Sequence, residues 1–274
     1  MEHFSDKVAV VTGAASGIGR ALVERCVAEG MRVVLADIEQ AALEAAVGEL
    51  RSAGHSVVGV RTDVSDADSV EALAQRAFDE FGAVHLLCNN AGVFGSRPGP
   101  IWQATLNDWR WILGVNVWGV IHGLRSFVPR MLDSGEQGWV VNTASMGGLV
   151  PGGSPYGVSK HAVVAISEAL YGNLAGSRVG CSVLCPIYVR TQILSAARNR
   201  PLDLVDADLA PGAPHRLARR IEAGQPPSEI ADAVFDGVRA GQFYIWPGDE
   251  VDHIVRTRFN HILERSNPEV RPFG

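Results

Sequence analysis

Short runs of apolar, β-branched residues alternate with helical patterns along most of the chain, and this alternation limits the fold more than any other feature. Each run is apolar on both faces, as is typical of a strand buried in a parallel sheet. The expected strands are Lys7–Thr12, Arg32–Ala36, Ser56–Arg61, Val84–Cys88, Trp139–Thr143, Val179–Leu184 and Phe243–Trp246. The expected helices are a segment that ends at Gly30, Gln40–Ala53, a helix from Ser65 to Glu80, Leu106–Leu132, Ser154–Ala175, a helix from Ser228 to Ala240, and Asp249–Arg265. Such alternation predicts an α/β fold, a doubly wound parallel sheet of about seven strands with helices on both faces.

Several helix starts carry residues that favour them. Ser65 and Ser228 are expected N-caps, and Thr105 or Asn107 stands near the start of the long helix. Pro155 suits the first turn after Ser154, because a first-turn residue needs no N–H. No repeat, linker or low-complexity tract interrupts the pattern. We therefore expect a single domain over residues 1–274, with residues 187–227 as a loop insertion over the sheet and residues 247–274 as a C-terminal helical extension.

Composition argues against several classes of partner. The net charge is −6 and no basic block occurs, so the chain is not expected to bind nucleic acid. No apolar run approaches the ~18 residues that a membrane span needs, and the N-terminus lacks the basic start and apolar core of a signal peptide. The four cysteines stand in apolar surroundings, which predicts reduced, buried thiols in a cytoplasmic protein with no metal site. They are Cys26, Cys88, Cys181 and Cys185.

A glycine-rich turn joins the first strand to the first helix. Gly13 permits a sharp turn, while Gly17 and Gly19 let a pyrophosphate and the strand come close to the helix N-terminus. The spacing is Gly-x3-Gly-x-Gly and not the commonest dinucleotide pattern, so a merely tight connection is the alternative. Asp37 and Asp63 end the second and third strands. The first could bind the adenosine ribose hydroxyls and the second could meet adenine, but either could instead be a helix cap.

Polar segments also follow the later strands directly. Asn89–Gly92 follows the fourth strand, Ser145 the fifth and Pro186–Thr191 the sixth. Because ligands bind beyond the carboxyl ends of parallel strands, these segments should converge on one site. The asparagine amides of the first segment could tie neighbouring strand ends together. Asn116 is a polar residue within an apolar helical stretch, and either a bridging water or a satisfied buried amide would explain that unfavourable position.

Tyr156 and Lys160 are four residues apart, so a helix places both side chains on one face. A fixed cation near a phenol favours the phenolate and lowers the phenol pKa. Such a phenol can accept or donate a proton at a reacting alcohol or carbonyl. The pair alone is a weak signal, because the same spacing occurs by chance on many surface helices.

Taken in order, these motifs resemble the classical type of the short-chain dehydrogenase/reductase family. The resemblance runs from about Lys7 to Trp246 and rests on Thr12–Gly19, Asp63, Asn89–Gly92, Asn116, Ser145 and the Tyr156–Lys160 pair. It implies a Rossmann-like fold and hydride transfer between a nicotinamide and an alcohol or ketone carbon. It further implies that Tyr156 is the general acid/base, that Lys160 lowers its pKa and holds the nicotinamide ribose, that Ser145 holds the substrate oxygen, and that Asn116 holds a water in a proton relay.

The resemblance also implies a cofactor site and a substrate pocket. The expected cofactor-binding residues are Gly13, Ser16, Gly17, Ile18, Gly19, Asp37, Asp63, Val64, Asn90, Ala91, Gly92, Tyr156, Lys160, Pro186, Val189 and Thr191. Asp37 predicts NAD as the cofactor. Arg20 and Arg32 are the nearest candidates for a cation that would favour NADP, but neither occupies the positions where NADP-preferring relatives usually carry one, since Ser16 and Ile38 stand there. The expected pocket wall suits a mainly apolar secondary alcohol or ketone. It consists of Val93, Phe94, Ser145, Met146, Leu149, Ile187, Tyr188 and Ile193.

Two positions depart from the family pattern. Ile187 stands where the family usually has glycine, so its side chain should narrow the pocket or shift the loop. Ser145 is closer to Tyr156 than the family serine commonly is, and Thr143 occupies the commoner distance. We favour Ser145, because the Ser-x-Gly-Gly context matches the family.

Two other functions remain open at this stage. One is a non-catalytic dinucleotide sensor with a protein partner, and the other is an epimerase or dehydratase on the same scaffold, although such chains usually carry a larger C-terminal domain. The family commonly forms tetramers through the helices predicted at 106–132 and 154–175, so a homotetramer that acts on a small-molecule substrate is expected.

Overall fold

Within the residues that the structure describes, the predicted strands form one seven-stranded sheet. The computed structural model describes residues 1–95, 100–206, 217–248 and 252–268. The strands are β1 (Val8–Thr12), β2 (Arg32–Asp37), β3 (Val57–Arg61), β4 (Leu86–Asn89), β5 (Gly138–Thr143), β6 (Val179–Leu184) and β7 (Tyr244–Ile245). Their order is β3-β2-β1-β4-β5-β6-β7, and all neighbouring pairs are parallel. The strand order reverses between β1 and β4, and open sheets bind ligands beyond the carboxyl ends at such a switch point.

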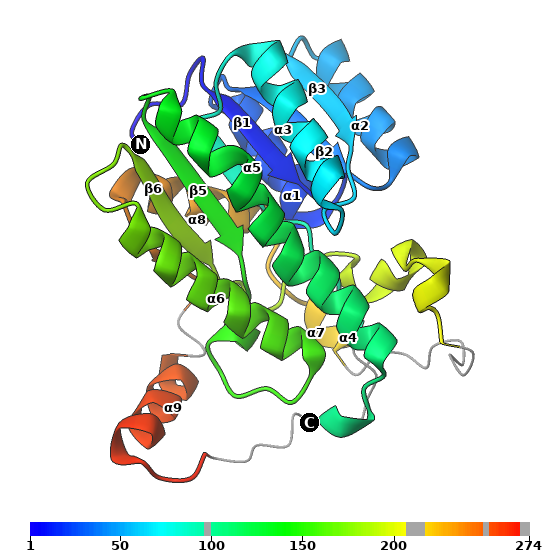
Figure 1. The fold of residues 1–274 in the computed structure, drawn as a ribbon, viewed down its shortest axis with the longest axis vertical. Coiled ribbons are helices and arrows are strands. Elements are labelled where there is room, and N and C mark those ends of the chain that lie inside the picture. The colour runs from blue at the N-terminus through cyan, green and yellow to red at the C-terminus, as the bar shows by residue number, and fades with distance from the viewer. Residues whose placement is uncertain (96–99, 207–216, 249–251, 269–274) are drawn as a thin grey trace.

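Helices cover both faces of the sheet, as the alternation predicts (Figure 1). The helices are α1 (Gly17–Ala28), α2 (Gln40–Ser52), α3 (Ala67–Phe81), α4 (Leu106–Leu113), α5 (Gly119–Asp133), α6 (Pro155–Asn173), α7 (Ala218–Glu222), α8 (Pro227–Ala240) and α9 (Asp252–Glu264). Buried side chains of α1, α2 and α8 form one core cluster against the sheet. Buried side chains of α3 and α5 form a second cluster on the opposite face. Within the described ranges, no helix combines the length and the apolar character that a bilayer span requires.

The two serine caps predicted from sequence are wrong. Asp66 caps α3 by accepting a hydrogen bond from the Asp68 N–H, because the Ser65 N–H and hydroxyl both donate to the Asp63 carboxylate at 2.9 and 2.7 Å. Helix α8 begins at Pro227, one residue before Ser228. The fixed φ of proline suits the first helical position, and this preference sets the boundary there.

The long predicted helix is continuous but changes its winding. Thr105 is its cap, since its hydroxyl accepts a hydrogen bond from the Asp108 N–H at 3.0 Å. Between α4 and α5 lies a π-helical turn, Gly114–Trp118, which contains Asn116. Such turns occur often at functional sites.

The segment after β6 contains more regular structure than its lack of sequence period indicates. It holds short 3₁₀ turns at Ile193–Asn199 and Leu202–Leu204, followed by α7. Residues 207–216 of the predicted insertion, and residues 249–251 and 269–274 of the predicted C-terminal extension, lie outside the described residues. Helix α9 lies away from the sheet, below α6 in the view of Figure 1, and has no fully buried residue.

Candidate active site

A cavity of about 540 Å³ lies at the carboxyl ends of the strands, where the sequence predicts the site. It is lined by every expected cofactor-binding residue except Gly19 and by every expected pocket residue except Leu149. The predicted catalytic residues Ser145, Tyr156 and Lys160 also line it, whereas Asn116 does not. Among the residues that the structure describes, no group of three or more His, Cys, Asp or Glu side chains could hold a metal ion. The cysteines within the same residues are all buried and unpaired.

Gly19 and Leu149 serve packing and not the cavity wall. A Cβ on Gly19 would lie 1.9 Å from the Gly13 carbonyl oxygen, so only glycine lets α1 lie against the turn. Leu149 is buried in the core cluster beside Val163 and Val164. Its predicted place in the substrate pocket stays a prediction, since Leu149 is not among the residues that line the cavity in this structure.

Asn116 is a satisfied buried amide, one of the alternatives that the sequence leaves open. Its Oδ1 accepts a hydrogen bond from the Val93 N–H at 2.8 Å, and its Nδ2 donates to the Val93 carbonyl and to the Ser159 hydroxyl at 3.1 and 3.0 Å. These bonds join the π-helical turn to the segment after β4 and to α6. Asn116 thus supports two walls of the cavity from behind.

The glycine-rich turn leaves an open cradle at the N-terminus of α1. Gly13 and Gly17 have φ values of +64° and +55°, a region that favours glycine. A Cβ on Gly13 would lie 3.0 Å from the Ala91 Cα, and one on Gly17 would lie 3.1 Å from the Thr191 methyl group. Side chains here would fill the space between the turn and the facing strand ends. A dinucleotide pyrophosphate fits such a cradle, because helix N-termini present free N–H groups to anions.

Asp37 ties the glycine-rich turn to the end of β2. Its buried carboxylate accepts hydrogen bonds from the Ala15 N–H at 2.9 Å and from the Glu39 N–H at 3.0 Å. Each carboxylate oxygen keeps a further lone pair, so the group can still accept a ribose hydroxyl. The N-cap residue of α2 is Glu39, so Asp37 is not the N-cap of that helix. The residues at this end therefore fit an NAD adenosine.

Among the described residues, the cavity lining includes a cation beside Glu39 that the sequence does not indicate. Arg20 pairs with Glu24 and Glu49 on the outer surface, and neither Arg20 nor Arg32 lines the cavity. Arg198 does line it, and its Nη2 lies 2.5 Å from Glu39 Oε1. Arg198 comes from the segment after β6, which has no sequence period to indicate where its side chains point.

The asparagine segment ties strand ends together as expected. Asn90 donates from its backbone N–H to the Thr12 hydroxyl and from Nδ2 to the Thr12 carbonyl, both at 2.9 Å. Asn89 Nδ2 donates to Asn142 Oδ1 at 2.9 Å. The carboxyl ends of β1, β4 and β5 are thereby held in register beside the cavity.

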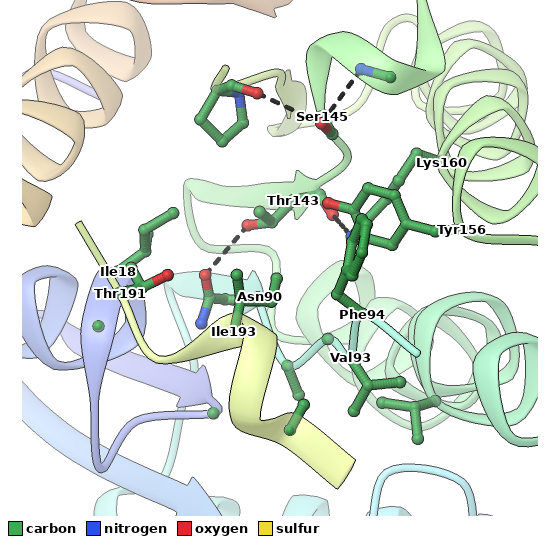
Figure 2. Close-up of a pocket in the computed structure, with 18 of the residues that line it drawn as sticks. Ile18, Asn90, Val93, Phe94, Thr143, Ser145, Tyr156, Lys160, Thr191 and Ile193 are labelled. Carbon is green, nitrogen blue, oxygen red and sulfur yellow. Dashed lines mark hydrogen bonds between the residues drawn. The ribbon is translucent and has the colours of Figure 1, made fainter. Parts of the chain in front are cut away.

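Tyr156 and Lys160 lie on one face of α6 and both border the cavity (Figure 2). Ser154 caps this helix through the Gly157 N–H, and Pro155 occupies its first turn, as predicted. Lys160 Nζ donates to the Thr143 carbonyl at 2.8 Å and lies 5.6 Å from the centre of the Tyr156 ring. The ammonium is thus held between β5 and the phenol face.

The predicted lowering of the Tyr156 pKa is wrong for this structure. Burial raises the pKa of Tyr156 to about 12, although a hydrogen bond with Ser145 acts in the opposite direction. Burial likewise lowers the pKa of Lys160 to about 8. Both shifts have the same cause, because loss of water disfavours the charged form of each group.

Ser145, and not Thr143, faces the phenol. The Ser145 hydroxyl is close enough to Tyr156 to act against the rise of the phenol pKa, accepts a hydrogen bond from the Gly147 N–H at 3.1 Å and lies 3.4 Å from the Pro186 carbonyl. The Thr143 hydroxyl points to Asn90 Oδ1 at 3.4 Å (Figure 2). This geometry agrees with the choice made from the Ser-x-Gly-Gly context.

The remainder of the cavity is mainly apolar. The Phe94 ring lies against the Tyr156 ring, with centres 4.6 Å apart (Figure 2). Ile187, which replaces the usual family glycine, lines the same space. Sequence reasoning missed several apolar lining residues from four separate segments: Trp111, Val115, Val150, Pro151, Leu217, Ile221 and Ile254. Their helical spacing marks some of them as apolar, but no local signal shows that they face a cavity and not the core.

Comparison with known proteins places these motifs in one family. A sequence model described as short chain dehydrogenase matches residues 7–201. A crystal structure of a short chain dehydrogenase/reductase from Burkholderia phymatum in complex with NAD superposes with a TM-score of 0.93 and 44% identity, covering 100% of both chains. The 1-deoxy-11-beta-hydroxypentalenate dehydrogenase of Streptomyces avermitilis is 38% identical over 95% of this chain and 91% of its own. A C alpha-dehydrogenase of a Sphingobium species is 33% identical over 98% of this chain and 89% of its own.

Proposed function

This chain belongs to the short-chain dehydrogenase family, and from that premise we propose that it oxidises a mainly apolar secondary alcohol, or reduces the matching ketone, in the cavity beside Tyr156. It is an NAD-dependent oxidoreductase. The observation that carries the proposal is that Ser145, Tyr156 and Lys160 line the same cavity as Asp37 and the glycine-rich turn.

NAD fits the residues at the strand ends and, when bound, supplies the hydride acceptor or donor. The glycine cradle of Gly13 and Gly17 would hold the pyrophosphate, and Asp37 would accept the adenosine ribose hydroxyls. Asp63, Val64, Asn90, Ala91 and Gly92 would border the adenine and the central part of the dinucleotide. Lys160 would hold the nicotinamide ribose, and Pro186, Val189 and Thr191 would bind the carboxamide side. The remaining cradle residues, Ser16 and Ile18, lie at the start of α1.

The acid/base chemistry is assigned to the Ser145–Tyr156 pair. The Ser145 hydroxyl would donate to the substrate oxygen and stabilise the negative charge that develops there. Tyr156 Oη would take the hydroxyl proton during alcohol oxidation and return it to the oxygen during ketone reduction. The presence of both side chains in the lining of one cavity supports this assignment, since one substrate oxygen there can meet both hydroxyls. Asn116, through its bonds to Val93 and Ser159, is better suited to position the walls than to hold a relay water with its side chain.

A mainly apolar substrate suits the lining. Val93, Phe94, Met146, Ile187, Tyr188 and Ile193 border the space around Tyr156. Trp111, Leu217 and Ile221 extend this apolar surface from other elements. A pocket of this composition gains affinity from burial of hydrocarbon, at about 25 cal/mol per Å².

Turnover of an alcohol panel with NAD, together with a fluorescence titration of NADH, tests the proposal. We expect tight NADH binding and oxidation of cyclic or aryl secondary alcohols at higher kcat/KM than of short polar ones. NADH binding without turnover of any alcohol or ketone would instead support the dinucleotide-sensor alternative. Interconversion of two sugar-nucleotide epimers, with no net release of NADH, would instead support the epimerase alternative.

Cofactor preference gives a first quantitative prediction. Asp37 should make the enzyme prefer NAD(H), because a 2′-phosphate would lie against its carboxylate in a partly dehydrated cleft. A cost of ~2–3 kcal/mol corresponds to a preference of about 30- to 150-fold. The double substitution Asp37→Ala and Ile38→Arg should therefore shift the ratio of kcat/KM values toward NADP(H).

Asp63→Ala is the matched control, since Asp63 also lines the cavity but at the predicted adenine side. It should weaken both cofactors to a similar extent. A wild-type ratio near one, or in favour of NADP(H), would mean that Asp37 serves only to tie the turn to β2.

A homotetramer built on the helices α4–α5 and α6 is also proposed. Its support is the set of large apolar side chains that these helices expose: Trp118, Leu132 and Val158 are 53%, 42% and 40% exposed. Light scattering at working concentration measures the assembly directly, and a monomer there would overturn the proposal.

The cytoplasmic location stays a prediction, and the buried free thiols are consistent with it.

A further inference from the structure

A charged contact bridges the cavity at its adenosine end. Glu39, which directly precedes α2, accepts hydrogen bonds on Oε1 from Arg198 Nη2 at 2.5 Å and from Asn199 Nδ2 at 2.8 Å. Its partners come from the 3₁₀ turn Ile193–Asn199, which lies across the cavity in the segment after β6. Glu39, Arg198 and Asn199 all line the cavity together with Asp37 and Ile38. The contact therefore borders the same space as the proposed ribose site.

Arg198 is held in place by more than Glu39. Its Nη1 donates to the Ser195 carbonyl at 2.9 Å and to the Ser195 hydroxyl at 3.1 Å. These bonds lie within its own 3₁₀ turn, so the guanidinium would stay near the ribose site if Glu39 lost its charge. Among the described lining residues, the other cationic side chain is Lys160, which borders Tyr156 and Thr143.

Glu39 keeps its negative charge at neutral pH. Its hydrogen bond with Arg198 holds the pKa of the Glu39 carboxyl below its usual value. The side chains of Arg198 and Glu39 are 36% and 30% exposed, so solvent screens their attraction only in part. Glu39 therefore neutralises the one described cation at this end, and it does so two residues from Asp37.

A 2′-phosphate would meet an unfavourable balance of charge in this arrangement. The Asp37 carboxylate would repel it, and the Arg198 guanidinium is already paired with a carboxylate. An unpaired guanidinium would be a strong partner instead, because its planar donors match a phosphate in a bidentate manner. The charge state of Glu39 therefore decides whether Arg198 can serve a phosphate.

We propose that Glu39 is a second determinant of cofactor specificity, which excludes NADP(H) by holding Arg198 in an ion pair, and that Arg198 is a latent 2′-phosphate site. The inference rests on the proposed NAD-dependent function and concerns residues beyond Asp37. Glu39 acts through Arg198, so its effect on NADP(H) requires that arginine to be present. This dependence separates the proposal from simple loss of a loop contact.

The test compares Glu39→Gln, Arg198→Ala and the double variant with the wild-type enzyme. Glutamine removes the charge but keeps an acceptor for Asn199. The readouts are the Kd values of NADH and NADPH from fluorescence, and the kcat/KM values with NAD and NADP. Glu49→Gln is the matched control, because it removes one carboxylate and one ion pair with Arg20 from the outer side of α2.

We expect Glu39→Gln to tighten NADPH binding by about 10-fold while the Kd for NADH changes by less than about threefold. The double variant should lose that gain, and Glu49→Gln should leave both Kd values as in the wild type. Equal weakening of both cofactors by Glu39→Gln would overturn the proposal, and so would an NADPH gain that survives the loss of Arg198. A wild-type protein that binds neither dinucleotide would overturn the proposed function itself.

Discussion

Replacing Tyr156 with phenylalanine should lower kcat for alcohol oxidation by about 10³-fold while the Kd for NADH stays within about threefold of the wild-type value. The substitution removes one hydroxyl and keeps the ring that packs against Phe94 and Lys160. The proton acceptor is lost, whereas the cofactor contacts proposed for Gly13, Gly17 and Asp37 remain. Steady-state rates and NADH fluorescence titration measure the two effects separately.

Tyr171→Phe provides a matched control on the same helix. Tyr171 is 54% exposed, its ring contacts Phe243, and neither residue lines the cavity. This variant should keep wild-type activity. Activity of Tyr156→Phe within a few-fold of wild type would exclude Tyr156 as the acid/base, and a parallel loss of NADH binding would indicate disturbed packing instead.

The second large effect is expected at Ser145. Ser145→Ala removes a hydroxyl that faces Tyr156 and should lower kcat by about 100-fold or more, the scale of losing one donor to a developing oxyanion. The Gly147 N–H would also lose its acceptor, which adds a small cost in stability. The measurement is kcat for the two single variants Ser145→Ala and Thr143→Ala. Thermal unfolding of each variant compares their stability.

Thr143→Ala should be much milder. The Thr143 hydroxyl contacts Asn90 at 3.4 Å, while the group that holds Lys160 is the Thr143 backbone carbonyl, which alanine retains. If Thr143→Ala proves the more damaging of the two, the alignment of the loop after β5 with the family pattern is wrong, and Ser145 serves only to position the turn.

The buried phenol and ammonium have a direct chemical consequence. With a pKa of about 12 for Tyr156, the phenol remains protonated across the neutral range in the cofactor-free protein. Lys160, with a pKa of about 8, is partly deprotonated at mildly alkaline pH. The protonated Tyr156 can therefore donate a proton during ketone reduction. Alcohol oxidation requires the phenolate form of Tyr156, which a positive charge brought into the cavity would stabilise.

Local sequence determined the sheet and most of the site. The apolar runs indicated the strands, and most clearly the central ones such as β1 and β4, because a strand buried on both faces must be apolar throughout. Since the carboxyl ends of parallel strands share one edge, Asp37, Asn90 and Ser145 could be assigned to one site without any contact information. The helical spacing of Tyr156 and Lys160 placed both on one face for the same kind of geometric reason.

Tertiary packing decided what no local pattern encodes. Leu149 and Ile221 are both apolar, but one faces the core and the other faces the cavity, because only the packed elements define which side of a turn is enclosed. The pKa values of Tyr156 and Lys160 follow from lost water, a property of their surroundings and not of their spacing. Arg198 reaches Glu39 across a separation of 159 residues, through a segment whose path follows from the finished fold. Periodicity encodes elements and their faces, whereas burial and long-range charge pairing exist only after those elements have packed.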